Sequence, residues 1–211
     1  MITLRIDDQK IEVAEGTNLL HACLANDIYI PNLCYIEGMK HPPVSCRLCF
    51  VEIEGRDHPV SSCSVWVGEA LVVHTDTPTV RQLQKTALQL LLSVHDVDCK
   101  NCPANRNCAL QEMAKFLKVA LKSKSFGRLL KETRIDERHP FLEYYPNRCV
   151  LCGKCVYVCR QHQNRVGLTF AKRGIDTVVS FYGRPHTEPP PCDSCQACVE
   201  VCPVAALLAK Y

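Results

Sequence analysis

The 211-residue sequence has no run of about 18 apolar residues, so no membrane-spanning helix is expected. Its first residues alternate apolar and polar side chains and turn acidic at Asp7, which is unlike a secretory signal peptide. Basic and acidic side chains nearly balance, 25 against 22, which does not favour nucleic acid or an anionic membrane as a partner. The G-x-G-x-x-G and G-x-x-x-x-G-K-[ST] nucleotide motifs are also lacking. We therefore expect a cytoplasmic protein without a self-contained substrate site.

Cysteine, in contrast, is abundant, with 16 in the chain. Disulfide scaffolds reach such densities but are usually short and secreted, so metal binding is the better interpretation here. All but one of the cysteines, together with one histidine, form four groups of four: Cys34, Cys46, Cys49 and Cys63; His95, Cys99, Cys102 and Cys108; Cys149, Cys152, Cys155 and Cys159; Cys192, Cys195, Cys198 and Cys202. Only Cys23 is left over, and we expect it to be a small buried residue.

The third and fourth groups repeat one spacing, C-x2-C-x2-C-x3-C, 43 residues apart. This is the spacing of bacterial ferredoxins, in which three cysteines hold one [4Fe–4S] cluster and the fourth reaches the other cluster. Tetrahedral zinc typically takes separated pairs of ligands, so zinc suits this spacing less well. The repeat predicts two crossed ligand sets: Cys149, Cys152, Cys155 and Cys202; and Cys192, Cys195, Cys198 and Cys159.

The first group has a close pair, Cys46 and Cys49, between two distant members, Cys34 and Cys63. A [2Fe–2S] cluster needs two thiolates on each iron, and a short loop can supply the pair. The spacing is not that of plant-type ferredoxins. A structural zinc is the alternative, because four thiolates with one close pair can form either site. The strands expected on both sides favour the [2Fe–2S] cluster.

The second group has three cysteines, Cys99, Cys102 and Cys108, and His95 stands four residues before the first of them. A histidine near a helix end is more often structural than a ligand. Here the three cysteines lack a fourth partner, so we predict that His95 completes a [4Fe–4S] site, with water or another residue as the alternative. A neutral imidazole makes a cluster less negative and raises its reduction potential, as in Rieske centres.

The residues around the first group predict a small mixed sheet wrapped over a helix. Thr17 is expected to cap that helix, which should end near Asn26. A hairpin is expected around Asp7-Asp8-Gln9, followed by two more strands. The expected strands cover residues 2–6, 10–13, 50–54 and 71–73.

Thr77 followed by Pro78 is typical of a helix start. A second helix should begin near Cys108, and the polar residues 122–138 should form a linker or surface segment. The basic side chains of residues 115–134 favour a solvated or docking surface over nucleic-acid binding. The apolar stripe of the first of these helices is expected at Val80, Leu83, Ala87, Leu90, Leu91 and Val94.

Three segments together resemble one family: Cys46-Arg47-Leu48-Cys49-Phe50-Val51-Glu52, the stretch from His95 to Gln111, and Pro146-Asn147-Arg148-Cys149-Val150-Leu151-Cys152-Gly153. The family is the iron–sulphur electron-transfer module shared by respiratory complex I, NAD-reducing hydrogenases and the N-terminal half of [FeFe] hydrogenases. Complex I large subunits generally lack one of the two ferredoxin-type clusters. Both cysteine sets are complete in this chain, which favours the hydrogenase branch. One departure is Gln196, where the family often has glycine.

The patterns and the resemblance predict an α+β protein with one [2Fe–2S] and three [4Fe–4S] clusters. Residues 1–77 are expected to form a β-grasp, [2Fe–2S] ferredoxin-like unit. Residues 78–140 are expected to form a helical unit with the His95 cluster, and residues 141–211 a bacterial-type ferredoxin-like unit with two [4Fe–4S] clusters. The last unit is too small to depend on an apolar core alone.

The function that the resemblance implies is an electron relay in an NAD(P)-linked hydrogenase. The implied partners are a diaphorase subunit that binds flavin (FMN) and NAD(P), and a hydrogen-activating subunit. Some relatives are electron-bifurcating and add ferredoxin as a third partner. The same relay in an NAD(P)-dependent formate dehydrogenase is one alternative, and a zinc-organised interaction module is the non-redox alternative. In each case the chain would be a subunit rather than a complete enzyme.

Overall fold

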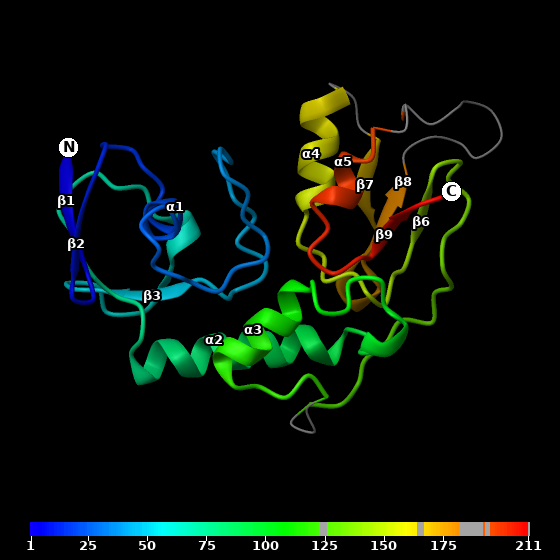
Figure 1. Cartoon of the computed structure of the whole chain (residues 1–211), viewed down its shortest axis with the longest axis horizontal. Coiled ribbons are helices and arrows are strands. Elements are labelled where there is room, and N and C mark those ends of the chain that lie inside the picture. The colour runs from blue at the N-terminus through cyan, green and yellow to red at the C-terminus, as the bar shows by residue number, and fades with distance from the viewer. Residues whose placement is uncertain (123–125, 164–166, 182–191, 193–194, 211) are drawn as a thin grey trace. The chain divides into compact units, whose positions relative to one another are not determined.

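The computed structural model describes residues 1–122, 126–163, 167–181, 192 and 195–210 (Figure 1). The chain divides into two compact units. Unit 1 comprises residues 1–89 and 115–119, and unit 2 comprises residues 90–114 and 120–211. Their boundary passes through α2 (Pro78–Ser93) and α3 (Ala109–Leu117), so the residues expected as one helical unit, 78–140, are divided between the two.

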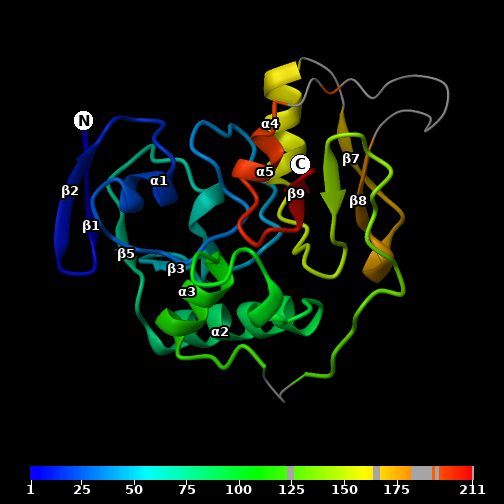
Figure 2. The same cartoon turned by 45° about the vertical axis from the view of Figure 1, so that its right-hand side comes forward.

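Unit 1 is built on a five-stranded mixed sheet in the order β2-β1-β5-β3-β4. The first two strands form the predicted antiparallel hairpin, and β5 runs parallel to β1 and antiparallel to β3. Helix α1 (Leu19–Leu24) lies beside this sheet in Figure 2, and its buried side chains join those of the strands in one core. The predicted sheet over a helix is thus confirmed. The strands are β1 (Ile2–Ile6), β2 (Gln9–Val13), β3 (Phe50–Ile53), β4 (Val60–Ser61) and β5 (Val72–His74).

The predicted cap of α1 was wrong by one residue. Asn18 caps the helix, because its side-chain oxygen accepts hydrogen bonds from two backbone N–H groups of the first turn. The hydroxyl of Thr17 instead donates to the carbonyl of Ala14. The helix ends at Leu24, before the predicted end near Asn26.

Helix α2 begins as predicted. Pro78 is its first residue, and the hydroxyl oxygen of Thr77 accepts a hydrogen bond from the N–H of Val80 at 3.1 Å. Helix α3 also begins next to Cys108, at Ala109, as expected. Both helix starts could be predicted because the chemistry of a helix start depends on only a few residues that are adjacent in the sequence.

The buried face of α2 agrees only in part with the predicted stripe. Leu88 and Leu92 are buried, whereas Leu90 is 50% exposed. Gln84 also lies on the buried face, and its side-chain amide donates to the backbone carbonyl of Phe50 at 3.2 Å. Val80 and Ala87 of the predicted stripe are buried as expected, and the prediction was wrong for Leu90. The buried Gln84, a polar residue with a partner, interrupts the apolar pattern.

Among its described residues, unit 2 contains two short antiparallel sheets and the helices α4 (Lys154–Gln163) and α5 (Ala197–Glu200), besides the end of α2 and most of α3. Helices α4 and α5 each begin inside one of the repeated cysteine runs, and they are in contact with one another. The repeat in the sequence therefore corresponds to a repeat of loop and helix. The strand pairs are β6 (Leu142–Tyr144) with β9 (Leu207–Ala209), and β7 (Leu168–Ala171) with β8 (Val178–Phe181).

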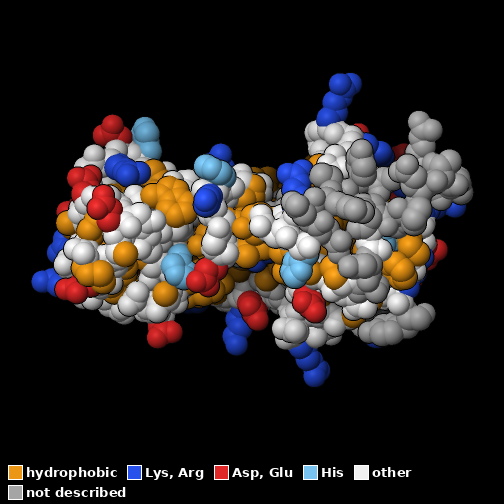
Figure 3. Space-filling view, turned by 90° about the horizontal axis from the view of Figure 1, so that it is seen from above, with side chains coloured by type: hydrophobic (Ala, Val, Ile, Leu, Met, Phe, Trp, Pro, Cys, Tyr) orange, Lys and Arg blue, Asp and Glu red, His pale blue; other side chains and the backbone are white. Residues whose placement is uncertain are grey.

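The described residues between Leu117 and Leu142 form neither a helix nor a named strand, as expected for the charged segment 122–138. Acidic and basic side chains are interspersed on the face shown in Figure 3. Over the part of the chain that the structure describes, no helix has the length and apolar character to cross a bilayer.

Candidate metal centres

The structure brings Cys34, Cys46, Cys49 and Cys63 together in unit 1, all of them buried. The sulfurs of Cys34 and Cys46 are 3.4 Å apart. A hydrogen bond from the Cys46 thiol lowers the pKa of Cys34, and one from Cys63 lowers the pKa of Cys49. The thiols of Cys46 and Cys63 each form a hydrogen bond with the sulfur of Cys34. This bond and burial raise the pKa of both thiols. Four buried sulfurs linked in this way have the donor chemistry of a thiolate-bound metal cluster.

Backbone contacts hold two of these cysteines in place. The carbonyl of Cys49 accepts from the backbone N–H of Ser62 at 2.8 Å and from its hydroxyl at 2.9 Å. The side-chain amide of Asn18 donates to the carbonyl of Cys63 at 2.8 Å. Arg47, inside the C-x-x-C turn, has a positive φ of 53°. Asn18 therefore both caps α1 and fixes the loop that carries the last cysteine.

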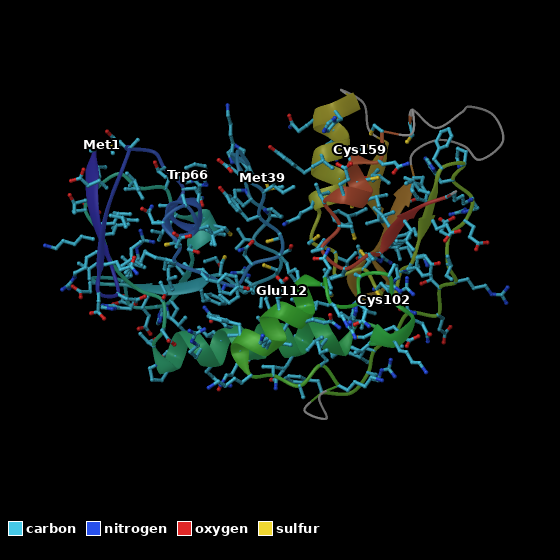
Figure 4. All side chains as sticks on the ribbon, viewed as in Figure 1. Met1, Met39, Trp66, Cys102, Glu112 and Cys159 are labelled. Carbon is cyan, nitrogen blue, oxygen red and sulfur yellow. The ribbon has the colours of Figure 1, made fainter. Side chains whose placement is uncertain are left out.

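The three cysteines of the second group lie together in unit 2, with Cys102 in the loop before α3 (Figure 4). Burial raises the pKa of the Cys108 thiol, and the charges of Cys102 and Cys99 raise it further. His95 follows α2 and is buried. Among the described residues, no hydrogen bond joins its ring to the three sulfurs.

The ring of His95 has a defined orientation. Its Nδ1 lies 2.9 Å from the backbone carbonyl oxygen of Arg148. A carbonyl oxygen only accepts, so Nδ1 carries the proton and Nε2 keeps a free lone pair. Burial lowers the pKa of His95, which favours the neutral ring that a metal ligand requires. The sequence alone did not identify the ligating nitrogen, because Arg148 lies far along the chain.

Each crossed set of ferredoxin-type cysteines surrounds a cavity of its own in unit 2. Cys159, on α4 (Figure 4), faces the cysteines of the second run, and Cys202 faces those of the first. Among the described residues, no group of three or more His, Cys, Asp or Glu side chains is arranged to hold one metal ion. One cavity is lined by Cys149, Cys152, Cys155 and Cys202, and the other by Cys159, Cys192, Cys195 and Cys198.

The first of these cavities has the properties of a thiolate site. Backbone N–H groups donate to two of its sulfurs, from Leu151 to Cys149 at 3.4 Å and from Ala206 to Cys202 at 3.2 Å. Burial raises the pKa of Cys152 to about 12. A buried thiolate without a counterion is costly. The positive charge of a bound metal offsets that cost, so a thiol that binds the metal loses its proton. The donor set therefore fits an iron–sulphur cluster.

Two backbone positions shape the second cavity. A Cβ at Gly167 would lie 2.8 Å from the sulfur of Cys159, closer than the van der Waals radii allow. Gln196 has a φ of 56°, and Gly153, at the same place in the first run, has a φ of 78°. This left-handed conformation favours glycine, and Gln196 adopts it with a side chain. No sequence pattern marks Gly167, because its contact with Cys159 depends on the fold.

Family models match three successive parts of the chain. Residues 1–78 match a 2Fe-2S iron-sulfur cluster binding domain. Residues 84–120 match the NADH-ubiquinone oxidoreductase-G iron-sulfur binding region, and residues 148–206 match a 4Fe-4S dicluster domain. These matches and the five-stranded sheet of unit 1 confirm the α+β fold class, with a [2Fe–2S] ferredoxin-like part followed by a [4Fe–4S] dicluster part.

The chain is similar to subunits of several redox complexes. It is 33% identical to the NADPH-Fe(3+) oxidoreductase subunit alpha of Geobacter sulfurreducens, over 100% of this chain and 24% of that protein. It is 32% identical to the NADP-reducing hydrogenase subunit HndD of Solidesulfovibrio fructosivorans, over 99% of this chain and 36% of that protein. The chain thus spans about a quarter to a third of these relatives.

A solved structure covers the whole chain. It is a chain of the NAD+-reducing [NiFe]-hydrogenase in the H2-reduced state, with a TM-score of 0.86 and 30% identity. The match extends over 100% of this chain and 88% of that chain. The similarity therefore extends over all the residues that carry the cysteine groups of this chain.

Proposed function

This chain belongs to the family of iron–sulphur electron-transfer subunits represented by that hydrogenase chain, and from this premise we propose that it relays electrons within an NAD(P)-linked hydrogenase. Its partners would be a diaphorase subunit that binds FMN and NAD(P), and a hydrogen-activating subunit, in the cytoplasm. The observation that carries the proposal is the arrangement of 15 cysteines and one histidine in four donor sets.

The proposed cofactors are one [2Fe–2S] and three [4Fe–4S] clusters, each of which takes up and releases one electron at a time when bound. The thiolates balance the charge of the iron, and the backbone N–H groups stabilise the thiolates. Burial keeps water from the sulfurs of the [2Fe–2S] set, whereas Cys195 of the last set is exposed. The [2Fe–2S] ligands are Cys34, Cys46, Cys49 and Cys63. The [4Fe–4S] ligands are His95, Cys99, Cys102 and Cys108; Cys149, Cys152, Cys155 and Cys202; and Cys159, Cys192, Cys195 and Cys198.

His95 would bind iron through Nε2, because its Nδ1 proton is held by the carbonyl of Arg148. Backbone carbonyls that accept the other ring N–H commonly fix a ligating histidine in this way. A neutral ligand in place of a thiolate raises the potential of that site relative to an all-cysteine site. The relay would therefore contain sites of unequal potential.

The test is a comparison of electron donors for the purified complex. The chain is produced anaerobically with its neighbouring subunits, and NAD(P)+ reduction is followed with hydrogen or with formate as the donor. We expect hydrogen to reduce both the clusters of this chain and NAD(P)+. A complex lacking this chain should still reduce a dye with hydrogen but should lose NAD(P)+ reduction.

Reduction by formate and not by hydrogen would assign the relay to a formate dehydrogenase and refute the hydrogenase proposal. Full NAD(P)+ reduction by the complex that lacks this chain would refute the relay role itself.

A further inference from the structure

Tyr144 is the largest side chain among the fully buried residues, with 1% of its surface exposed. It lies at the end of β6, where it pairs with Leu207 of β9. Its side chain lines the same cavity as Cys149 and Cys202. A phenol with a polar hydroxyl is therefore enclosed beside proposed cluster ligands.

The hydroxyl oxygen of Tyr144 accepts a hydrogen bond from the backbone N–H of Val179 at 3.1 Å. The hydroxyl proton then needs an acceptor of its own, because a buried O–H without a partner is costly. The sulfur of Cys149 lines the same cavity as this hydroxyl and interacts with it, so it is the acceptor assigned to that proton. The same sulfur also accepts the N–H of Leu151 at 3.4 Å.

We propose that Tyr144 is a positioning residue that acts through Cys149, and that its hydrogen bond raises the reduction potential of the cluster held by this cysteine. A reduced cluster is more negative than an oxidised one. A hydrogen-bond donor at a ligating sulfur therefore stabilises the reduced state more than the oxidised state, which raises the reduction potential. The inference rests on the proposed function, in that it takes Cys149 to be a cluster ligand.

The test is a potentiometric titration of the full chain, prepared anaerobically and followed by electron paramagnetic resonance. In Tyr144→Phe, one [4Fe–4S] signal should shift to a more negative potential. Its ratio of reduced to oxidised form at a fixed potential should fall about tenfold, which corresponds to about 59 mV for one electron. The signals of the other clusters should not move.

Tyr145→Phe is the matched control. Its hydroxyl donates to Glu143 at 3.0 Å instead of to a cysteine, so the same loss of a hydroxyl one residue away should leave all potentials unchanged. An equal shift in the control, or no shift in Tyr144→Phe with all clusters present, would overturn the proposal.

Incorporating 3-fluorotyrosine at position 144 decides the question if the phenylalanine variant does not fold. The fluorinated phenol is a stronger donor of nearly the same size, so the same signal should shift to a more positive potential. An unchanged or more negative potential would overturn the role of Tyr144. A wild-type chain without [4Fe–4S] signals would instead refute the proposed function.

Discussion

Removal of iron will unfold residues 141–211, while unit 1 keeps its sheet. The described strands of the C-terminal part have only three or four residues, and its two described helices have ten and four. Several of its buried side chains are cysteines that surround the two cavities. A part of about 70 residues with so small an apolar core depends on cross-links, and ligand binding supplies them.

Unit 1 differs from the C-terminal part because apolar side chains, and not only cluster ligands, form its core. Leu4, Ile6, Leu19, Leu20 and Val51 are completely buried between the sheet and α1. This packing resembles that of an ordinary small domain. We therefore expect the iron-free form to be folded in one part and unfolded in the other.

Hydrogen exchange measured by mass spectrometry separates the two parts in one experiment. After chelation of iron under reducing conditions, amides of the described residues between 141 and 210 should lose protection, whereas those of β1, β2 and β5 should keep it. Trp66 is the only tryptophan of the chain, so its fluorescence reports the state of unit 1 alone. Retention of native protection across residues 141–210 would contradict the prediction.

Gly167→Ala will remove the second ferredoxin-type cluster. The added methyl group would lie 2.8 Å from the sulfur of Cys159, so the sulfur or the backbone must move. Cluster ligation requires four sulfurs at fixed positions, and loss of one ligand exposes an iron. We expect about four fewer iron atoms per chain and the loss of one [4Fe–4S] signal.

Gly127→Ala is the matched control, because nothing lies within 4 Å of an added Cβ there and the position is in the same unit. It should retain full iron content and all signals. If Gly167→Ala also keeps its full iron content and unchanged signals, the sulfur of Cys159 is free to move and the predicted loss of the cluster is wrong.

Local chemistry allowed much of the fold and of the donor sets to be predicted. The spacing of the cysteine runs requires the fourth cysteine of each run to reach the other site, and the structure places Cys159 and Cys202 in that way. The start of α2 depends on Thr77 and Pro78, which are adjacent in the sequence. Such features need no knowledge of distant residues.

The sequence could not predict features that depend on contacts between distant residues. The tautomer of His95 is set by Arg148, 53 residues away, and the close approach of Gly167 to Cys159 exists only in the folded chain. The buried face of α2 was predicted only in part, because Gln84 is buried with a partner on another element. Polar residues on a buried face therefore limit what periodicity can predict.

The central claim is that this chain carries four iron–sulphur clusters, and the most direct test is its content of iron and acid-labile sulfide after anaerobic preparation. The motif stoichiometry predicts about 14 iron atoms and as many sulfides per chain, with reduced-state paramagnetic signals at graded potentials. A protein without iron and sulfide, or with zinc in their place, would contradict the claim.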